Sequence, residues 1–358
     1  MKPLDHIISA AKAAHRHIVL AEGEDLRIID GAIRAVDDGI AHITLLGNGD
    51  RIRNALAARS ADPALFQIEN PLLSTRIQSY AAAYFDLRRH KGVDEVGAIR
   101  AVSDPLGFAA MMVRQGDADG TIGGAMATTA NTVRAALQII GKAPGSHIVS
   151  SFFVMILDEP HHAKKGAFIF TDCGLVVDPK ASELADIAVA SAASYRALIG
   201  GKPKVAMLSF STSGSAVHER VTKVMKAVEL AKAAAPGLTI DGELQFDAAF
   251  VETVSVIKTP GSALHGAANV LVFPNLEAAN IGYKIAERIG GAKAIGPILQ
   301  GLAKPANDLS RGCSADDVYH MIAVTGAQAF ENWEQHELAT TDTDTRCRRQ
   351  SRRAAHRY

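Results

Sequence analysis

A hydroxyl, a guanidinium and a carboxylate fall close together near the end of the chain, at Ser310, Arg311 and Asp317. The planar guanidinium of arginine binds phosphate oxygens through two parallel hydrogen bonds and keeps its charge at physiological pH. Gly312 lets the chain turn after this pair, and Ser314 is suited to begin a helix that carries Asp317 in its first turn. A carboxylate there could accept a proton in the same pocket. The cluster therefore predicts transfer of an acyl group between a phosphate and a neutral nucleophile.

Each member of this cluster also has a structural interpretation. Ser314-x-x-Asp317 fits a helix capping box, and Asn307-Asp308 is a common pair in turns. A single arginine is most often a solvated surface residue. The residue types and their spacing leave both interpretations open.

Residues 304–312 read KPANDLSRG, which is similar to the C-terminal signature of the phosphate acetyltransferase (phosphotransacetylase) family. Other segments resemble that family in the same order, from near residue 15 to near residue 329: 87–92, 128–140, 205–216, 241–245, 268–274 and 280–284. The resemblance implies the reaction of acetyl phosphate with coenzyme A to give acetyl-CoA and inorganic phosphate, in either direction. It also implies that no cofactor is tightly bound, because coenzyme A is a substrate.

The resemblance assigns roles to the cluster. Asp317 matches the base that deprotonates the thiol of coenzyme A, Ser310 would donate a hydrogen bond to the developing oxyanion or orient the thiol, and Arg311 would hold the phosphate. The residues predicted to bind substrate are Arg88, Arg134, Thr128, Thr129, Asn307, Ser213, Gly214 and Ser215. Three positions depart from the family's pattern: Gly123, Ala127 and Asn131.

Two of these predictions also rest on the residues themselves. Thr128, Thr129 and Arg134 lie at the start of an apolar helical segment, where backbone N–H groups and the helix dipole favour an anion. The hydroxyl-rich run 209–215 joins an expected strand to an expected helix and could cradle a phosphate in the same way. It lacks the lysine of a P-loop, and helix capping alone would explain its serines.

Composition limits the remaining classes. A chain of 358 residues is long enough for two domains. Its 38 basic and 38 acidic side chains give no net field for nucleic acid or a membrane surface. The spacing of its three cysteines fits neither a disulfide framework nor a zinc site, and no apolar run reaches the ~18 residues of a membrane span. We expect a cytoplasmic protein without a metal, a nucleic-acid partner or a membrane partner.

Short aliphatic runs alternate with alanine-rich amphipathic segments, which predicts an α/β protein with parallel sheets covered by helices. The expected strands are 17–21, 43–47, 205–210, 238–241 and 270–273, with a hairpin over 148–172. The expected helices are 29–37, 75–89, 132–140, 182–199, 215–235 and 277–289.

The resemblance implies two α/β domains with the active site in the cleft between them, and a homodimer. The predicted first domain is discontinuous, residues 1–147 plus 305–330, and residues 148–304 form an inserted second domain. Residues 331–358 are rich in arginine and poor in apolar residues, so we expect a disordered tail.

Several alternatives stay open. The enzyme could be a phosphate butyryltransferase or another acyl-phosphate acyltransferase, because each additional methylene is worth only about 1 kcal/mol in a pocket. A non-catalytic domain that binds coenzyme A or an acyl phosphate belongs to a different class, and an intact Ser-Arg-Asp set argues against it. A decarboxylating dehydrogenase of related architecture would need a carboxylate cluster for a divalent metal, which the sequence does not show.

Overall fold

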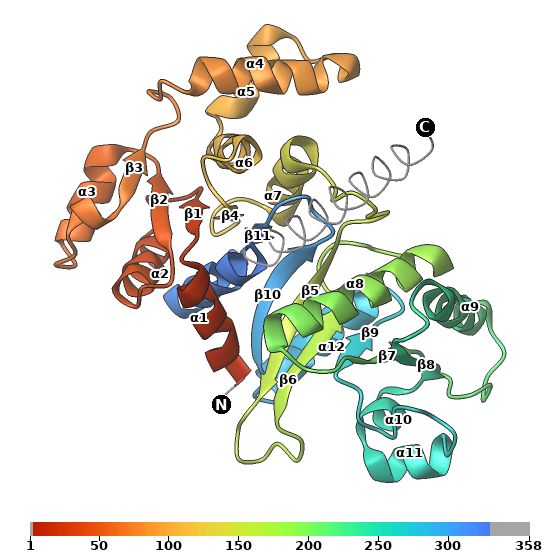
Figure 1. Cartoon of the computed structure of the whole chain (residues 1–358). Coiled ribbons are helices and arrows are strands. Elements are labelled where there is room, and N and C mark those ends of the chain that lie inside the picture. The colour runs from red at the N-terminus through yellow and green to blue at the C-terminus, as the bar shows by residue number, and fades with distance from the viewer. Residues whose placement is uncertain (1–2, 330–358) are drawn as a thin grey trace, which may run out of the picture.

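The first of two β-sheets consists of five short strands that pair only in parallel (Figure 1). This computed structural model describes residues 3–329. The strand order is β11-β4-β1-β2-β3, with β1 (His17–Leu20), β2 (His42–Leu46), β3 (Gln67–Glu69), β4 (Gly120–Gly123) and β11 (Ala306–Asp308). Apolar side chains alternate between its faces, since Ile18 and Leu20 belong to one core cluster and Val19 to another.

The second sheet has six strands and mixed pairing. Its order is β10-β5-β6-β9-β7-β8, with β5 (Ser150–Leu157), β6 (Gly166–Thr171), β7 (Lys204–Leu208), β8 (Thr239–Leu244), β9 (Val270–Val272) and β10 (Lys293–Gln300). β5 and β6 form the antiparallel hairpin expected within 148–172, with Leu157 opposite Gly166. β5 is buried on both faces, which explains why its sequence is a continuous apolar run.

Helices cover both sheets. They are α1 (Pro3–Ala14), α2 (Leu26–Asp37), α3 (Gly49–Ala57), α4 (Ile77–Arg88), α5 (Glu95–Ser103), α6 (Pro105–Gln115), α7 (Thr129–Ala135), α8 (Ala181–Ile199), α9 (Glu219–Ala234), α10 (Phe246–Phe250), α11 (Glu252–Lys258), α12 (Leu276–Arg288) and a helix over residues 315–329. α8 packs on the face of the second sheet that carries Val154, and α12 packs on the face that carries Phe153. The predicted α/β class with helix-covered, mostly parallel sheets is confirmed.

The predicted elements are present, but three helices begin three or more residues from the predicted start. α2 starts at Leu26 and not at 29, because Asp25 is its N-cap. α9 starts at Glu219 and not at 215, because the His218 side chain accepts a hydrogen bond from the backbone N–H of Arg220 and caps the helix there. α7 starts at Thr129, three residues before the predicted 132, because Thr128 is its N-cap. Its continuation, Ala136–Ile140, is a π-helical turn. Strands β3, β4, β10 and β11 are absent from the sequence prediction.

The end of the chain returns to the first sheet. β11 pairs with β4, so residues 306–308 lie beside residues 121–123. One continuous apolar cluster includes Ile18 of β1, Val154 of β5 and Ile322 of the 315–329 helix. The predicted boundaries, 1–147 with 305–330 and 148–304, stay a prediction, and the predicted tail 331–358 lies outside the described residues.

Within residues 3–329 no single helix is long and apolar enough to cross a membrane. The pair α5 and α6 would qualify only by combined length and composition, and the chain bends by 96° between them.

Candidate active site

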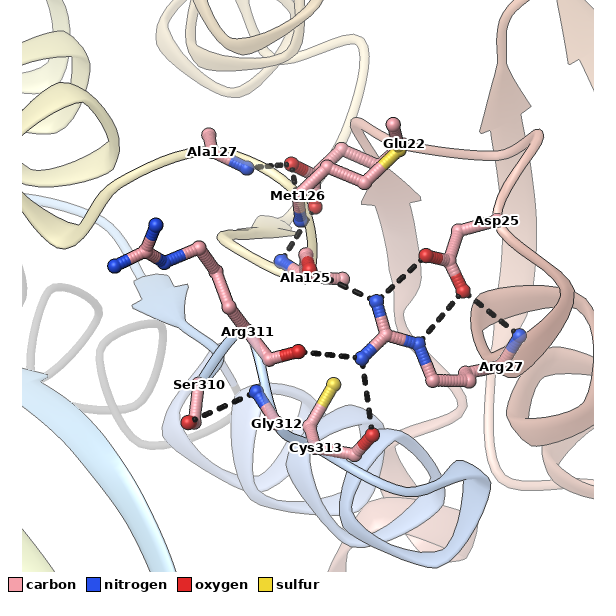
Figure 2. Close-up of polar contacts among 10 residues, drawn as sticks. All are labelled: Glu22, Asp25, Arg27, Ala125, Met126, Ala127, Ser310, Arg311, Gly312 and Cys313. Carbon is pink, nitrogen blue, oxygen red and sulfur yellow. Dashed lines mark hydrogen bonds and ion pairs between the residues drawn. The ribbon is translucent and has the colours of Figure 1, made fainter.

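The signature segment forms a tight turn between β11 and the 315–329 helix, which we call the signature loop (residues 309–314). Ser310, Arg311 and Gly312 are exposed. The Gly312 N–H donates to Ser310 Oγ over 3.2 Å, which fixes the turn and leaves the Ser310 hydroxyl hydrogen free. Figure 2 shows the Arg311 guanidinium extending away from the loop, and it makes no hydrogen bond or ion pair with residues 3–329. Both side chains are therefore available to a ligand.

Arg27, near the start of α2, holds the signature loop from behind (Figure 2). Its Nη1 donates to the carbonyl oxygens of Arg311 at 2.7 Å and Cys313 at 3.2 Å, and its Nη2 donates to the Ala125 carbonyl at 2.8 Å. Asp25 pairs with the same guanidinium at 2.7 Å. This hydrogen bond raises the pKa of Arg27 and holds the pKa of Asp25 below its ordinary value. Arg27 thus uses its fork on backbone oxygens and orients Arg311 by its main chain.

Glu22 fixes the loop that precedes α7. Its carboxylate accepts hydrogen bonds from the backbone N–H groups of Ala125 (2.6 Å), Met126 (3.0 Å) and Ala127 (2.7 Å) (Figure 2). The loop then delivers Thr128 to the N-cap of α7. Sequence analysis missed both Glu22 and Arg27, although they follow the carboxyl end of a parallel strand, where binding residues commonly lie.

Asp317 occupies the first turn of the 315–329 helix, as predicted. Its Oδ2 accepts from the Ser314 backbone N–H at 2.8 Å and from Ser314 Oγ at 2.9 Å, while Ser314 Oγ accepts from the Asp317 N–H at 3.2 Å. This is the predicted capping box. The other carboxylate oxygen is not used by the cap, and the residue also lines a cavity.

This central cavity, of about 490 Å³, brings the predicted catalytic residues together. Its walls come from the end of β11, from the signature loop, from the start of α7, from α12 and from β5 and β10, so both sheets contribute. The predicted site residues that line it are Ser310, Arg311, Asp317 and Thr129, and Ala127 lines it where the family pattern differs.

Another part of the central cavity's wall is partly aromatic and partly cationic. Phe153 and Tyr283 stack with their ring centroids 4.2 Å apart, and burial raises the pKa of Tyr283 to about 12, so its hydroxyl stays protonated. Lys284 and Arg288 extend this wall along α12. The cavity therefore offers a flat apolar surface next to positive charge.

A second space, the side cavity, shares Thr129 and Gly174 with the central cavity and has a volume of about 560 Å³. Arg134, Val133 and Leu137 line it, which makes it more apolar than the central cavity. Arg134 donates to Asn131 Oδ1 at 2.9 Å, so the residue that departs from the family pattern orients this arginine. Two adjoining spaces suit an elongated, amphipathic ligand.

Other predicted substrate residues lie elsewhere. Arg88 ends α4 and does not line either cavity. Asn307 is fully buried, and its amide donates to Thr325 Oγ1 and Gln328 Oε1 while accepting from the Leu299 N–H at 2.8 Å. Its side chain therefore ties β11 to β10 and to the last helix.

Ser213, Gly214 and Ser215 also lie outside both cavities. The Gly214 N–H donates to Glu243 Oε1 at 2.8 Å, and Ser215 Oγ accepts from the Thr212 N–H at 3.0 Å. Among residues 3–329, no group of three or more His, Cys, Asp or Glu side chains is arranged to hold a metal ion.

The chain is similar to known proteins over most of its length. The family described as phosphate acetyl/butaryl transferase matches residues 3–326. A phosphate acetyltransferase of Paracoccus denitrificans is 52% identical over 92% of this chain and 99% of its own length. One from Acetivibrio thermocellus is 47% identical over 92% and 98%. A phosphotransacetylase structure from Streptococcus pyogenes superposes with a TM-score of 0.85 at 42% identity, covering 91% of this chain and 97% of that one.

Proposed function

The chain belongs to the phosphate acetyl/butaryl transferase family, and from that premise we propose that it transfers an acetyl group reversibly between acetyl phosphate and coenzyme A in the central cavity. The observation that carries this proposal is the convergence of a free hydroxyl, an unpaired guanidinium and a carboxylate on one cavity: Ser310, Arg311 and Asp317. These groups supply a hydrogen-bond donor, a phosphate ligand and a proton acceptor.

The chemistry proceeds by direct attack in a ternary complex. Asp317 takes the thiol proton, because a thiol with a pKa near about 8.5 is mostly protonated at neutral pH and only the thiolate is a good nucleophile. The sulfur then bonds to the acetyl carbonyl carbon, the C–O bond to the phosphoryl group breaks, and inorganic phosphate leaves. Ser310 donates to the developing oxyanion, and Arg311 binds the phosphate oxygens as a fork.

Coenzyme A is long and has both apolar and anionic parts, which suits the two adjoining cavities. The side cavity offers Leu137 and Val133 beside Arg134, and α12 adds Lys284 and Arg288 at the central cavity. These cations favour phosphates without a metal, and we propose no tightly bound cofactor. We also propose a cytoplasmic location, because the proposed reaction needs no membrane.

A homodimer is supported by an unpartnered apolar stripe. Ile281, Ile285 and Ile289, spaced four residues apart along α12 and its C-cap, are exposed by 59%, 53% and 83%. A second copy of the chain that packs on this stripe would remove its apolar surface from water. Light scattering on the full chain, with Ile285→Lys as the disrupting variant, tests this point.

Acyl preference is the remaining choice. Relatives that are 52% and 47% identical are phosphate acetyltransferases, which favours acetyl over butyryl. The deciding experiment measures acyl-CoA formation from acetyl, propionyl and butyryl phosphate side by side without added metal. Butyryl phosphate as the best substrate would replace the acetyl assignment, and no turnover of any substrate by folded protein would favour the binding domain.

A further inference from the structure

Asp308 is an acidic residue at the central cavity for which the mechanism above has no use. It is the last residue of β11 and directly precedes the signature loop. Its side chain is fully buried, and the residue belongs to the wall of the central cavity with Ser310 and Arg311. A carboxyl group buried beside a site for anions needs a physical explanation.

The surroundings of Asp308 leave its carboxyl group without a fixed partner. Neither oxygen makes a hydrogen bond of standard geometry with any residue in 3–329. The hydroxyls of Thr129 and Thr132 are the side-chain donors close enough to lower its pKa. Gly124 admits the carboxyl group, since a Cβ at that position would lie 2.1 Å from Asp308 Oδ1.

Burial is the largest influence on this group and raises the pKa of Asp308 to about 6, with the negative charge of Glu22 acting in the same direction. The elements that pack against or follow β11 carry these other ionisable groups: Arg134 in α7, Lys293 in β10, Arg311 and Cys313 in the signature loop, and Asp316, Asp317 and His320 in the helix that follows. Burial also raises the pKa of the Cys313 thiol, so it stays neutral.

Thr129 connects Asp308 to the cavity. It is the first residue of α7, which packs against β11, and it lines both the central and the side cavity. A hydroxyl has a single hydrogen to donate. If Asp308 is ionised it attracts that hydrogen, and the oxygen of Thr129 faces the cavity as an acceptor. If Asp308 is protonated it donates to Thr129, which can then donate to an anion.

We propose that Asp308 is a positioning residue that acts through Thr129, so that an anion binding beside Arg311 takes up one proton from solvent onto the Asp308 carboxyl group. The inference rests on the proposed function only in taking the physiological anion to be a phosphoryl group. In this proposal Asp308 is protonated when the anion is bound, and this role is separate from that of Asp317 as the base.

Sulfate is the suitable probe, because unlike phosphate it does not titrate near neutrality. Its dissociation constant for the full chain, measured by calorimetry, should rise at least fivefold between about pH 6 and about pH 8, since linkage allows up to about tenfold per pH unit above the pKa. In Asp308→Asn, whose amide always donates, the change should shrink to less than about twofold.

Two controls locate and specify the effect. Arg311→Gln should abolish sulfate binding at both pH values, which assigns the signal to this cavity. Asp178→Asn makes the same chemical change at an exposed ion pair with Lys223 and should keep the wild-type dependence on pH. An unchanged pH dependence in Asp308→Asn would overturn the proposal.

Thr129 provides a second variant that does not disturb the core, because the residue is exposed. Thr129→Val should bind sulfate weakly at both pH values and lose the pH dependence, whereas Thr129→Ser should keep it. Wild-type behaviour of Thr129→Val would overturn the proposal even if Asp308→Asn did not fold. Sulfate binding requires no acyl transfer, so a failure of the proposed function is seen separately, in the acyl-CoA assay.

Discussion

Two loops in this molecule have similar composition, but their polar groups have different partners. The signature loop and the serine loop (residues 209–215) each follow the carboxyl end of a strand and contain hydroxyls and a glycine. In the serine loop, Ser211 Oγ and the Gly214 N–H both donate to Glu243 Oε1 at 2.8 Å, and Glu243 is 2% exposed. In the signature loop, Arg27 binds the backbone carbonyls and leaves the side chains of Ser310 and Arg311 to solvent.

The difference teaches when a hydroxyl-rich turn is a binding site. The serine loop has the backbone geometry of an anion cradle, but the chain fills it with its own carboxylate. The backbone carbonyls of the signature loop accept hydrogen bonds from Arg27, so the Ser310 hydroxyl and the Arg311 guanidinium stay available to a ligand. The two loops therefore differ in the charge of the side chain that binds them, which is the acidic Glu243 in the serine loop and the cationic Arg27 in the signature loop.

The largest expected effect comes from Asp317. Asp317→Asn should lower kcat by at least ~10²-fold with small changes in KM, because general-base catalysis is worth ~10²–10⁴-fold and acts in the transition state. Ser314→Ala is the matched control: it removes the capping partner but keeps the base, and should cost about 1 kcal/mol of stability. Equal activity losses in both variants would reduce Asp317 to its capping role.

Arg311 comes next. Arg311→Lys keeps the charge and loses the fork, and since hydrogen bonds to charged groups are worth about 1.5–3 kcal/mol, activity should fall by roughly 10- to 100-fold. The readout is the KM for inorganic phosphate in the reverse direction. A lysine variant with nearly normal phosphate affinity would show that charge alone suffices there.

Arg27→Ala tests whether the support of the signature loop matters as much as its side chains. The carbonyls of Arg311 and Cys313 lose their donor, and Asp25 loses its ion-pair partner, so we expect a loss of about 2 kcal/mol in unfolding free energy and roughly tenfold in kcat/KM. Denaturant unfolding and steady-state kinetics on the same preparation measure both. Unchanged kinetics with the expected loss of stability would mean that the loop holds its shape without Arg27.

The smallest effect on turnover should come from the serine loop. Ser211→Ala leaves Glu243 without one of its donors and should lower stability by about 1–2 kcal/mol. Ser213→Ala and Ser215→Ala should leave kcat/KM within about twofold, since neither residue lines a cavity. A large rise in the KM for coenzyme A in either variant would restore the substrate role predicted from sequence and weaken the contrast between the loops.

Sequence reasoning grouped the candidate site residues that are close together in the chain. Ser310, Arg311 and Asp317 could be grouped because one loop and one helical turn carry them. Arg27 and Glu22 could not, since the loops that they hold lie about a hundred or more residues away and are bound through backbone atoms, which every residue has. Asn307, which lies within the signature, was predicted to bind substrate, whereas its amide makes its hydrogen bonds inside the fold.

The fold shows the same division. Long amphipathic helices such as α8 and apolar strands such as β5 were predictable from periodicity. β11 was not, because Ala306–Asp308 contains two polar residues and becomes a strand only by pairing with β4. Similarly, Gly120–Gly123 has two glycines and no β pattern, yet β4 is buried throughout. Tertiary context decides such short strands.

The pairing of β11 with β4 also has a consequence for biosynthesis. β4 leaves the ribosome long before its neighbour β11 exists, and at about 5–20 residues per second the wait is on the order of 10–40 s. During that time one edge of a parallel sheet has no partner and can pair with another nascent chain. The candidate active site is completed only when β11 has been synthesised. An interrupted translation product should therefore be inactive and prone to aggregation. A chaperone that shields the β4 edge should raise the yield of the whole enzyme.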